Sequence, residues 1–168
     1  MMLLRRADYV TRPWRNGGGV SHEIAWHAEE DWRLGLAEIV RDGAFSDYAG
    51  FDRTLTIGQG QGLWLNAHAL GPDPFSFRGE EAIAARVTAG PLVVVNAITR
   101  RGFCGHEVRR SPAQGRLSGS DFVVALGGPV RASGETLQAL DTLRLDGATV
   151  EVEGGPDTEV LAIRFFAT

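Results

Sequence analysis

Residues 32–40 read Trp-Arg-Leu-Gly-Leu-Ala-Glu-Ile-Val, and this stretch decides the fold class. From Trp32 onward every second residue is apolar, apart from Glu38, and a period of two is the signature of a β-strand. Residues 53–57 repeat the alternation. Residues 92–98 are rich in β-branched side chains, as is typical of a central strand. The sequence therefore predicts a sheet protein.

Short apolar runs extend this pattern in both directions along the chain. Turn signals such as Arg41-Asp42-Gly43 and Asp146-Gly147 separate them, and the chain contains 22 glycines and 7 prolines. The further strands that we expect are residues 20–26, 63–66, 74–77, 85–88, 121–126, 129–133, 142–145, 149–153 and 159–166. Many short strands with few helical windows predict an all-β sandwich or barrel.

The strands fall into two sets, at residues 53–95 and 121–166. The stretch from 100 to 120 is polar and rich in turn residues, so we expect it to connect the two sets. A length of 168 residues is about that of one domain. Two equivalent halves and one irregular sandwich both fit the pattern.

Composition excludes several classes of function. The net charge of −4 argues against a nucleic-acid binder with a basic face. All 17 basic residues are arginine, which excludes a lysine Schiff base and a P-loop. Cys104 is the sole cysteine, so no internal disulfide forms. No apolar run approaches the ~20 residues that span a bilayer, and we expect a soluble cytoplasmic protein without a membrane partner.

The segment Trp14-Arg15-Asn16-Gly17-Gly18-Gly19-Val20 is the first candidate for a binding site. Three successive glycines let the backbone adopt unusual angles and let another group approach closely. A flexible turn before the strand at residues 20–26 is one interpretation. The other is a pocket, because Trp-Arg-Asn stands immediately before the glycines.

Three polar residues are in phase with apolar ones. Glu38 shares the face of Leu34 and Leu36, and Arg53 and Asn96 likewise alternate with apolar neighbours. Each has a structural interpretation, such as an ion pair that offsets burial. Together they indicate a partly polar cavity of the kind that holds a small ligand.

Further candidates lie in loops. Of the adjacent Arg100 and Arg101, at most one points inward, where it would clamp a carboxylate. Ser46 lies in a loop, where its hydroxyl can donate a hydrogen bond. His68 and the pair Cys104/His106 are weak metal candidates because no His-x-His or His-Glu-x-x-His motif is present. We therefore predict no metal and no cofactor.

These segments together resemble the bacterial HutD/Ves family over nearly the whole chain. The residues that carry the resemblance are Pro13 to Val20 with Glu23-Ile24, Asp31-Trp32-Arg33 through Ala37-Glu38, Gly43 to Ser46, Phe51 to Thr56, Asn96 to Gly102 and Leu140 to Leu143. Two departures are Ser21-His22, where Thr-Arg is common, and Ile98 in place of a methionine.

The resemblance implies a cupin-like β-barrel of the jelly-roll kind with two cupin-type halves, a bicupin, packed in one compact chain of residues 1–168. The halves would be about 1–99 and 115–168, with the connection at 100–120. The typical metal-binding pattern of cupins is missing. The pocket candidates that follow by motif match are Trp14, Arg15, Asn16, Glu38, Ser46, Arg53, Asn96 and Arg100.

The family also implies a function. Its members are similar to proteins encoded among histidine-utilisation genes, where they are thought to bind N-formylglutamate or a related small carboxylate and to moderate the pathway. The alternatives are an enzyme acting on a small acid or sugar derivative with Glu38 as general acid or base, and a stress-related protein. We favour the binding protein over the enzyme, and expect a homodimer by default.

Overall fold

The computed structural model describes all residues, 1–168, and consists of strands with one 3-10 turn at Arg6–Asp8. The all-β prediction is confirmed. None of its helical segments is long and apolar enough to cross a membrane. The chain divides into two compact units. We call them the larger unit, Val10–Gly105 with Ala167–Thr168, and the smaller unit, Met1–Tyr9 with His106–Phe166.

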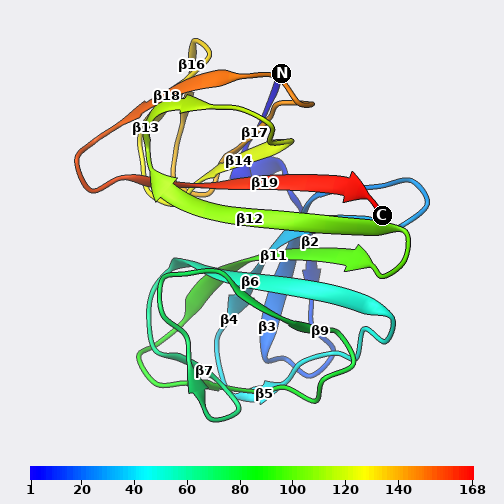
Figure 1. Ribbon diagram of the computed structural model, residues 1–168. Helices are drawn as coiled ribbons and strands as arrows, with labels where there is room; N and C mark the ends of the chain where they lie inside the picture. Colours follow the sequence, from blue (N-terminus) through cyan, green and yellow to red (C-terminus); the bar gives the residue numbers. More distant parts are fainter. The chain divides into compact units, whose positions relative to one another are not determined.

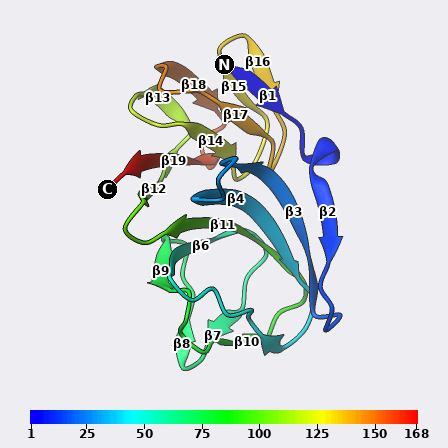
Figure 2. The same cartoon turned by 90° about the vertical axis from the view of Figure 1, so that its right-hand side faces the viewer.

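The larger unit contains a six-stranded antiparallel sheet in the order β2-β3-β4-β11-β6-β9 (Figure 2). Its strands are β2 (Val10–Pro13), β3 (Gly19–Trp26), β4 (Trp32–Ile39), β6 (Phe51–Gln59), β9 (Phe75–Arg78) and β11 (Leu92–Arg100). The β-branched run at residues 92–98 occupies β11, which pairs with β4 on one side and β6 on the other. A central position explains why nearly all of β11 is buried.

A second, four-stranded sheet faces this one in the order β5-β10-β7-β8. Its strands are β5 (Gly43–Ala44), β7 (Leu63–Leu65), β8 (His68–Ala69) and β10 (Ala84–Val87). The apolar core lies between the two sheets and includes Leu55, Leu65 and Val94. It fills one part of the interior of the larger unit.

The smaller unit repeats the two-sheet plan (Figure 1). One sheet has the order β1-β17-β14-β19-β12, and the other β13-β18-β15-β16. The bounds are β1 (Met2–Leu4), β12 (Cys104–Pro112), β13 (Gln114–Leu117), β14 (Phe122–Ala125), β15 (Val130–Ala132), β16 (Glu135–Leu137), β17 (Thr142–Arg144), β18 (Val150–Gly154) and β19 (Glu159–Ala167). Its apolar core includes Val123, Leu143 and Val160.

The boundary between the two units, at Gly105 and His106, lies within the expected connection at residues 100–120, but β12 and β13 occupy most of that stretch. β12 is an edge strand of its sheet. An edge strand tolerates charged residues and a terminal proline, here Pro112, so its sequence lacks the apolar alternation of a buried strand. The expected halves also change, because Met1–Tyr9 joins the residues after 105 and β1 pairs with β17.

The sheets in each unit stay separate and do not close into one hydrogen-bonded barrel. Each unit is a pair of facing sheets, which is the jelly-roll-like arrangement expected of a cupin half. The cupin-like, all-β class therefore agrees with the structure, and the equivalence of the two units as cupin halves stays a prediction.

Candidate functional site

The polar residues Arg53 and Asn96 lie on the same face of the six-stranded sheet. Asn96 in β11 pairs with Leu55 in β6, and Arg53 in β6 pairs with Ile98 in β11. Residues directly opposite in an antiparallel pair share a face, so Arg53, Leu55, Asn96 and Ile98 all project to one side. Leu55 belongs to the core between the two sheets. Both polar side chains therefore project into the interior of the larger unit.

Arg53 is buried in an aromatic box. Its residue is 6% exposed, and its guanidinium carbon lies 4.9 Å, 5.0 Å and 5.4 Å from the ring centres of Tyr48, Phe77 and Phe45. Such contacts stabilise a cation electrostatically. They do not neutralise it, and burial lowers the pKa of Arg53 to about 10. The side chain is therefore still charged at neutral pH.

No carboxylate pairs with this cation. Its one hydrogen bond in the structure is a long contact of 3.5 Å, in which Nη1 donates to the carbonyl oxygen of Ser46. Nε is buried and has no acceptor. A buried charge without a partner is costly, which makes an anionic ligand the natural complement of Arg53.

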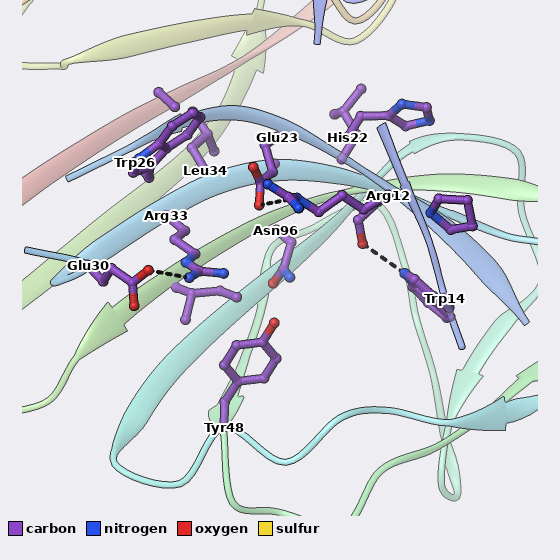
Figure 3. A pocket seen from close by; sticks show the side chains of 16 residues that line it. Arg12, Trp14, His22, Glu23, Trp26, Glu30, Arg33, Leu34, Tyr48 and Asn96 are labelled. Carbon is purple, nitrogen blue, oxygen red and sulfur yellow. Dashed lines mark hydrogen bonds and ion pairs between the residues drawn. The ribbon is translucent and has the colours of Figure 1, made fainter. Parts of the chain in front are cut away.

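Asn96 supplies a second unsatisfied group. Its Oδ1 is buried and accepts no hydrogen bond. Figure 3 shows the Asn96 side chain directed toward the Tyr48 hydroxyl, with Arg33 to one side. Most buried polar side-chain atoms have a hydrogen-bond partner, so this amide oxygen is available to accept a hydrogen bond from a ligand.

The segment at residues 14–18 is an ordered hairpin turn between β2 and β3. The Trp14 backbone donates to Gly19 O at 2.9 Å, and Gly17 N donates to Trp14 O at 3.0 Å. Asn16 Oδ1 accepts from Gly18 N at 2.8 Å, and Gly17 has a φ of +69° that favours glycine. The segment is thus an ordered turn, and it also carries Trp14, Arg15 and Asn16 to the lining of a pocket.

Trp14 is held in place from two sides. Its Nε1 donates to Ser21 Oγ at 2.8 Å, and its ring meets Phe45 edge-on at 6.3 Å. A side-chain carbon on Gly19 would lie 3.0 Å from the Trp14 ring and would collide with the carbonyl oxygen of Glu38. A glycine at position 19 is therefore required for the observed position of the Trp14 ring.

Two adjoining pockets open on this face of the larger unit. We call the one around Arg53 the arginine pocket; it measures about 450 Å³. The other, which we call the glycine pocket because Gly35 lies in its lining, measures about 550 Å³. Both are within the size range of small-molecule sites. The residues that line both are Trp14, Ser21, Tyr48 and Asn96.

Six of the eight residues expected from the sequence line the arginine pocket: Trp14, Arg15, Asn16, Ser46, Arg53 and Asn96. Arg15, Asn16 and Ser46 are exposed, so they form the mouth, whereas Arg53 is buried. The pocket therefore has a second cation, Arg15, at its entrance.

The other two expected residues, Glu38 and Arg100, lie outside both pockets. Glu38 pairs across the strands with Val93 and Val20, on the sheet face opposite Arg53 and Asn96, and its carboxylate contacts His22 Nε2 at 3.0 Å. Arg100 lies 3.6 Å from the Asp31 carboxylate. Neither lines either pocket.

Sequence reasoning missed the aromatic box and the charged rim. Phe45 and Tyr48 flank Ser46 in a loop without any periodic pattern, so no sequence signal placed them around Arg53. The rim of the glycine pocket carries two ion pairs (Figure 3). They are Arg12–Glu23, with atoms 3.3 Å apart, and Arg33–Glu30, at 3.1 Å.

The weak metal candidates of the sequence do not come together. His68 stacks on Phe75 at 4.6 Å, and the Cys104 thiol donates to Gly105 O at 3.4 Å. A different group, His27, Glu29 and Asp31, has ligand atoms within 4.8 Å of one another. Arg100 already contacts Asp31, so this loop is an ion-pair cluster at the surface.

The fold and site define a protein made of two antiparallel two-sheet units, one of which carries two adjoining pockets within the size range of small-molecule sites. The HutD family model matches residues 6–162. The chain therefore belongs to the HutD family, as the resemblance of its motifs indicated.

One relative of this chain comes from a histidine-utilisation gene region. An uncharacterized 21.2 kDa protein of Pseudomonas putida, from the 3′ region of hutC, is 36% identical over 109 residues. That match covers 58% of this chain and 57% of that protein's length. The family is thus linked to the histidine-utilisation (hut) locus.

Solved structures of similar proteins cover almost the entire chain. HutD from Pseudomonas fluorescens SBW25, described in a formate condition, is 30% identical, with a TM-score of 0.84 over 99% of this chain and 98% of that one. PA5104 of Pseudomonas aeruginosa PAO1, a conserved protein of unknown function, is 24% identical, with a TM-score of 0.86 over the same shares. The second likeness concerns the fold alone.

Proposed function

We propose that this protein binds a small carboxylate, N-formylglutamate or a related acid, and thereby moderates histidine utilisation in the cytoplasm. The observation that carries the proposal is the Arg53 guanidinium, which is buried without an acidic partner at the arginine pocket. A carboxylate accepts two hydrogen bonds from one guanidinium, and such charge-assisted pairs are among the strong ones.

The other pocket residues fit the rest of such a ligand. Arg15 at the mouth offers a second cation, which suits an acid with two carboxylates. Ser46 and Asn96 offer hydrogen bonds for an amide or formyl group, and the Trp14 ring forms an apolar wall. The hut-locus relatives support the choice of a pathway intermediate.

A binding role fits the geometry better than the enzyme alternative. The proposed general base, Glu38, lies on the other face of the sheet and contacts His22. General-base catalysis requires the base within hydrogen-bonding reach of the proton that it removes. A ligand in the arginine pocket does not meet that requirement with Glu38.

Thermal unfolding with and without millimolar N-formylglutamate tests the proposal, with urocanate, glutamate and formate as comparison compounds. A ligand at ~100 times its Kd adds about 2.7 kcal/mol, or roughly 5–10 °C for a chain of this length. We expect that shift in the native protein and its loss in Arg53→Met. An equal shift in both proteins would contradict the role of Arg53. Light scattering on the same samples tests the expected homodimer.

A further inference from the structure

Arg101, the second of the two adjacent arginines at the end of β11, clamps carboxylates of the protein itself. Its Nη1 and Nη2 donate to the two carboxylate oxygens of Glu80, each at 3.0 Å. Its Nε donates to Asp52 Oδ1 at 3.0 Å, and Nη2 also donates to the carbonyl oxygen of Phe51 at 3.1 Å. Hydrogen bonding from Arg101 lowers the pKa of Glu80 to about 2, so this carboxylate stays ionised at neutral pH. One guanidinium therefore joins the start of β6 to the chain that follows β9.

The chain between β9 and β10 supports one wall of the arginine pocket from behind. We call residues 45–50 the aromatic loop, because they carry Phe45 and Tyr48 of the aromatic box. Phe45 N donates to Ile83 O at 2.9 Å, and Tyr48 N donates to Gly79 O at 2.9 Å. The aromatic loop is therefore hydrogen-bonded at two points to the connection between β9 and β10.

Gly79 lies so close to the aromatic loop that a side chain does not fit between them. A carbon added to Gly79 would overlap the carbonyl oxygen of Tyr48 and lie 2.7 Å from the Tyr48 Cβ. Gly79 N also donates to Phe51 O at 2.7 Å, and this is the carbonyl that Arg101 contacts. Because Glu80 follows Gly79 directly, a shift of Glu80 moves the backbone that packs on Tyr48.

The exposure of the clamp separates a local role from a contribution to overall stability. The side chains of Arg101, Asp52 and Glu80 are 36%, 48% and 38% exposed. Exposed ion pairs contribute little to the free energy of unfolding. A guanidinium that binds both oxygens of one carboxylate nevertheless fixes the direction of its partner. The expected effect of the clamp is therefore on the position of the aromatic loop.

We infer that Arg101 is a positioning residue of the arginine pocket, which acts through Glu80 to hold the Tyr48 ring over the buried cation. The Tyr48 ring centre lies 4.9 Å from the Arg53 guanidinium carbon, and Figure 3 shows the Tyr48 hydroxyl directed toward Asn96. Displacement of this ring removes a wall from both pockets. The effect on ligand affinity rests on the proposed function, whereas the position of Tyr48 is measured without any ligand.

Fluorine NMR of protein labelled with fluorotyrosine reports this position directly. The chain has two tyrosines, Tyr9 and Tyr48, so each gives one signal, and Tyr48→Phe assigns them. In Arg101→Gln we expect the Tyr48 signal to shift toward that of the unfolded chain and the Tyr9 signal to stay in place. The midpoint of thermal unfolding should stay within about 4 °C of the native value, as expected for an exposed ion pair.

Three further variants test the clamp from its other end and by partial restoration. Glu80→Gln should shift the Tyr48 signal as Arg101→Gln does, and the double variant should shift it no further, because both changes break one contact. Arg101→Lys keeps the charge but loses the bidentate geometry, so its shift should be intermediate. Arg144→Gln is the matched control, because Arg144 pairs with Asp146 at 2.6 Å and is 41% exposed; its Tyr48 signal should be native.

Calorimetric titration with N-formylglutamate measures the consequence for binding. We expect about fivefold weaker binding in Arg101→Gln and in Glu80→Gln, the scale of effect for a residue that does not touch the ligand. A native Tyr48 signal in folded Arg101→Gln would overturn the clamp, and a shifted signal with native affinity would overturn its role in binding. Should Arg101→Gln fail to fold, Glu80→Gln decides both points. If the native protein does not bind the acid, the proposed function fails, and the fluorine signals alone decide whether Arg101 positions Tyr48.

Discussion

The Arg53 guanidinium lies 4.9 Å from the centre of the Tyr48 ring, and Tyr48 lines both pockets. The aromatic contact holds the cation in place without neutralising it. A loop residue and a strand residue thus combine to keep a positive charge available in the interior of the larger unit.

Replacement of Arg53 by methionine should stabilise the protein while abolishing acid binding. A buried cation without a carboxylate costs folding free energy, and an apolar side chain of similar length avoids that cost. We expect a gain of about 1–3 kcal/mol in the free energy of unfolding, measured by urea titration. Arg86→Met is the control, because Arg86 stacks on Trp64 at 4.8 Å but is exposed. A loss of stability in Arg53→Met would show that the guanidinium contributes to folding.

Alanine at Gly19 should displace Trp14 and damage the arginine pocket. The new carbon would contact the Trp14 ring at 3.0 Å and overlap the carbonyl oxygen of Glu38. We expect a destabilisation of about 2–4 kcal/mol and a shifted tryptophan emission. Gly71→Ala is the matched control, because the added carbon meets nothing within 4 Å there. Unchanged emission and stability would mean that the turn adapts without moving the ring.

Tyr9→Phe should weaken the smaller unit in a pH-dependent way. The Tyr9 hydroxyl donates to Leu140 O at 2.9 Å and is hydrogen-bonded with Thr142 Oγ1 at 2.8 Å. Burial raises the pKa of Tyr9 to about 12. In the folded protein the Tyr9 phenol therefore stays protonated above pH 10, where the same phenol in the unfolded chain ionises.

The stability that Tyr9 contributes is fully present below about pH 10 and is lost as the pH rises through 12. Urea titrations of native protein and Tyr9→Phe should differ by about 1–2 kcal/mol at pH 7, and the difference should shrink between pH 10 and pH 12. A constant difference up to pH 12 would contradict this assignment.

Changes at Glu38 and Arg100 should leave acid binding intact. Glu38 projects from the face opposite the pockets, and Arg100 contacts Asp31. We expect Glu38→Gln and Arg100→Ala each to bind N-formylglutamate within about twofold of the native protein, or about 0.4 kcal/mol. Asn96→Leu, which removes a pocket residue of similar size, should bind far more weakly. A large loss of N-formylglutamate affinity in Glu38→Gln would instead support a functional role for the Glu38 carboxylate.

The sequence predicted the phase of β4 and β6 correctly but not how the strands align. Alternation placed Arg53 with Leu55 and Glu38 with Leu36, and the structure agrees. Whether Arg53 and Glu38 share a face depends on the register between β6, β11 and β4. Register is set by cross-strand pairing and is not encoded in the period of one strand.

Two other features, strand β12 and the aromatic box around Arg53, could not be predicted from the sequence, each for a different reason. β12 lies at a sheet edge, where half-buried polar residues replace the apolar alternation. The aromatic box around Arg53 draws Phe45 and Tyr48 from a loop and Phe77 from β9. Contacts among residues from separate elements arise only when the sheets have packed.

A crystal structure of the protein with N-formylglutamate tests the central claim most directly. The account predicts a ligand carboxylate with its oxygens roughly 2.7–2.9 Å from the Arg53 guanidinium nitrogens, the length of a charge-assisted hydrogen bond. An occupied ligand whose carboxylates contact other residues and leave Arg53 untouched would contradict it.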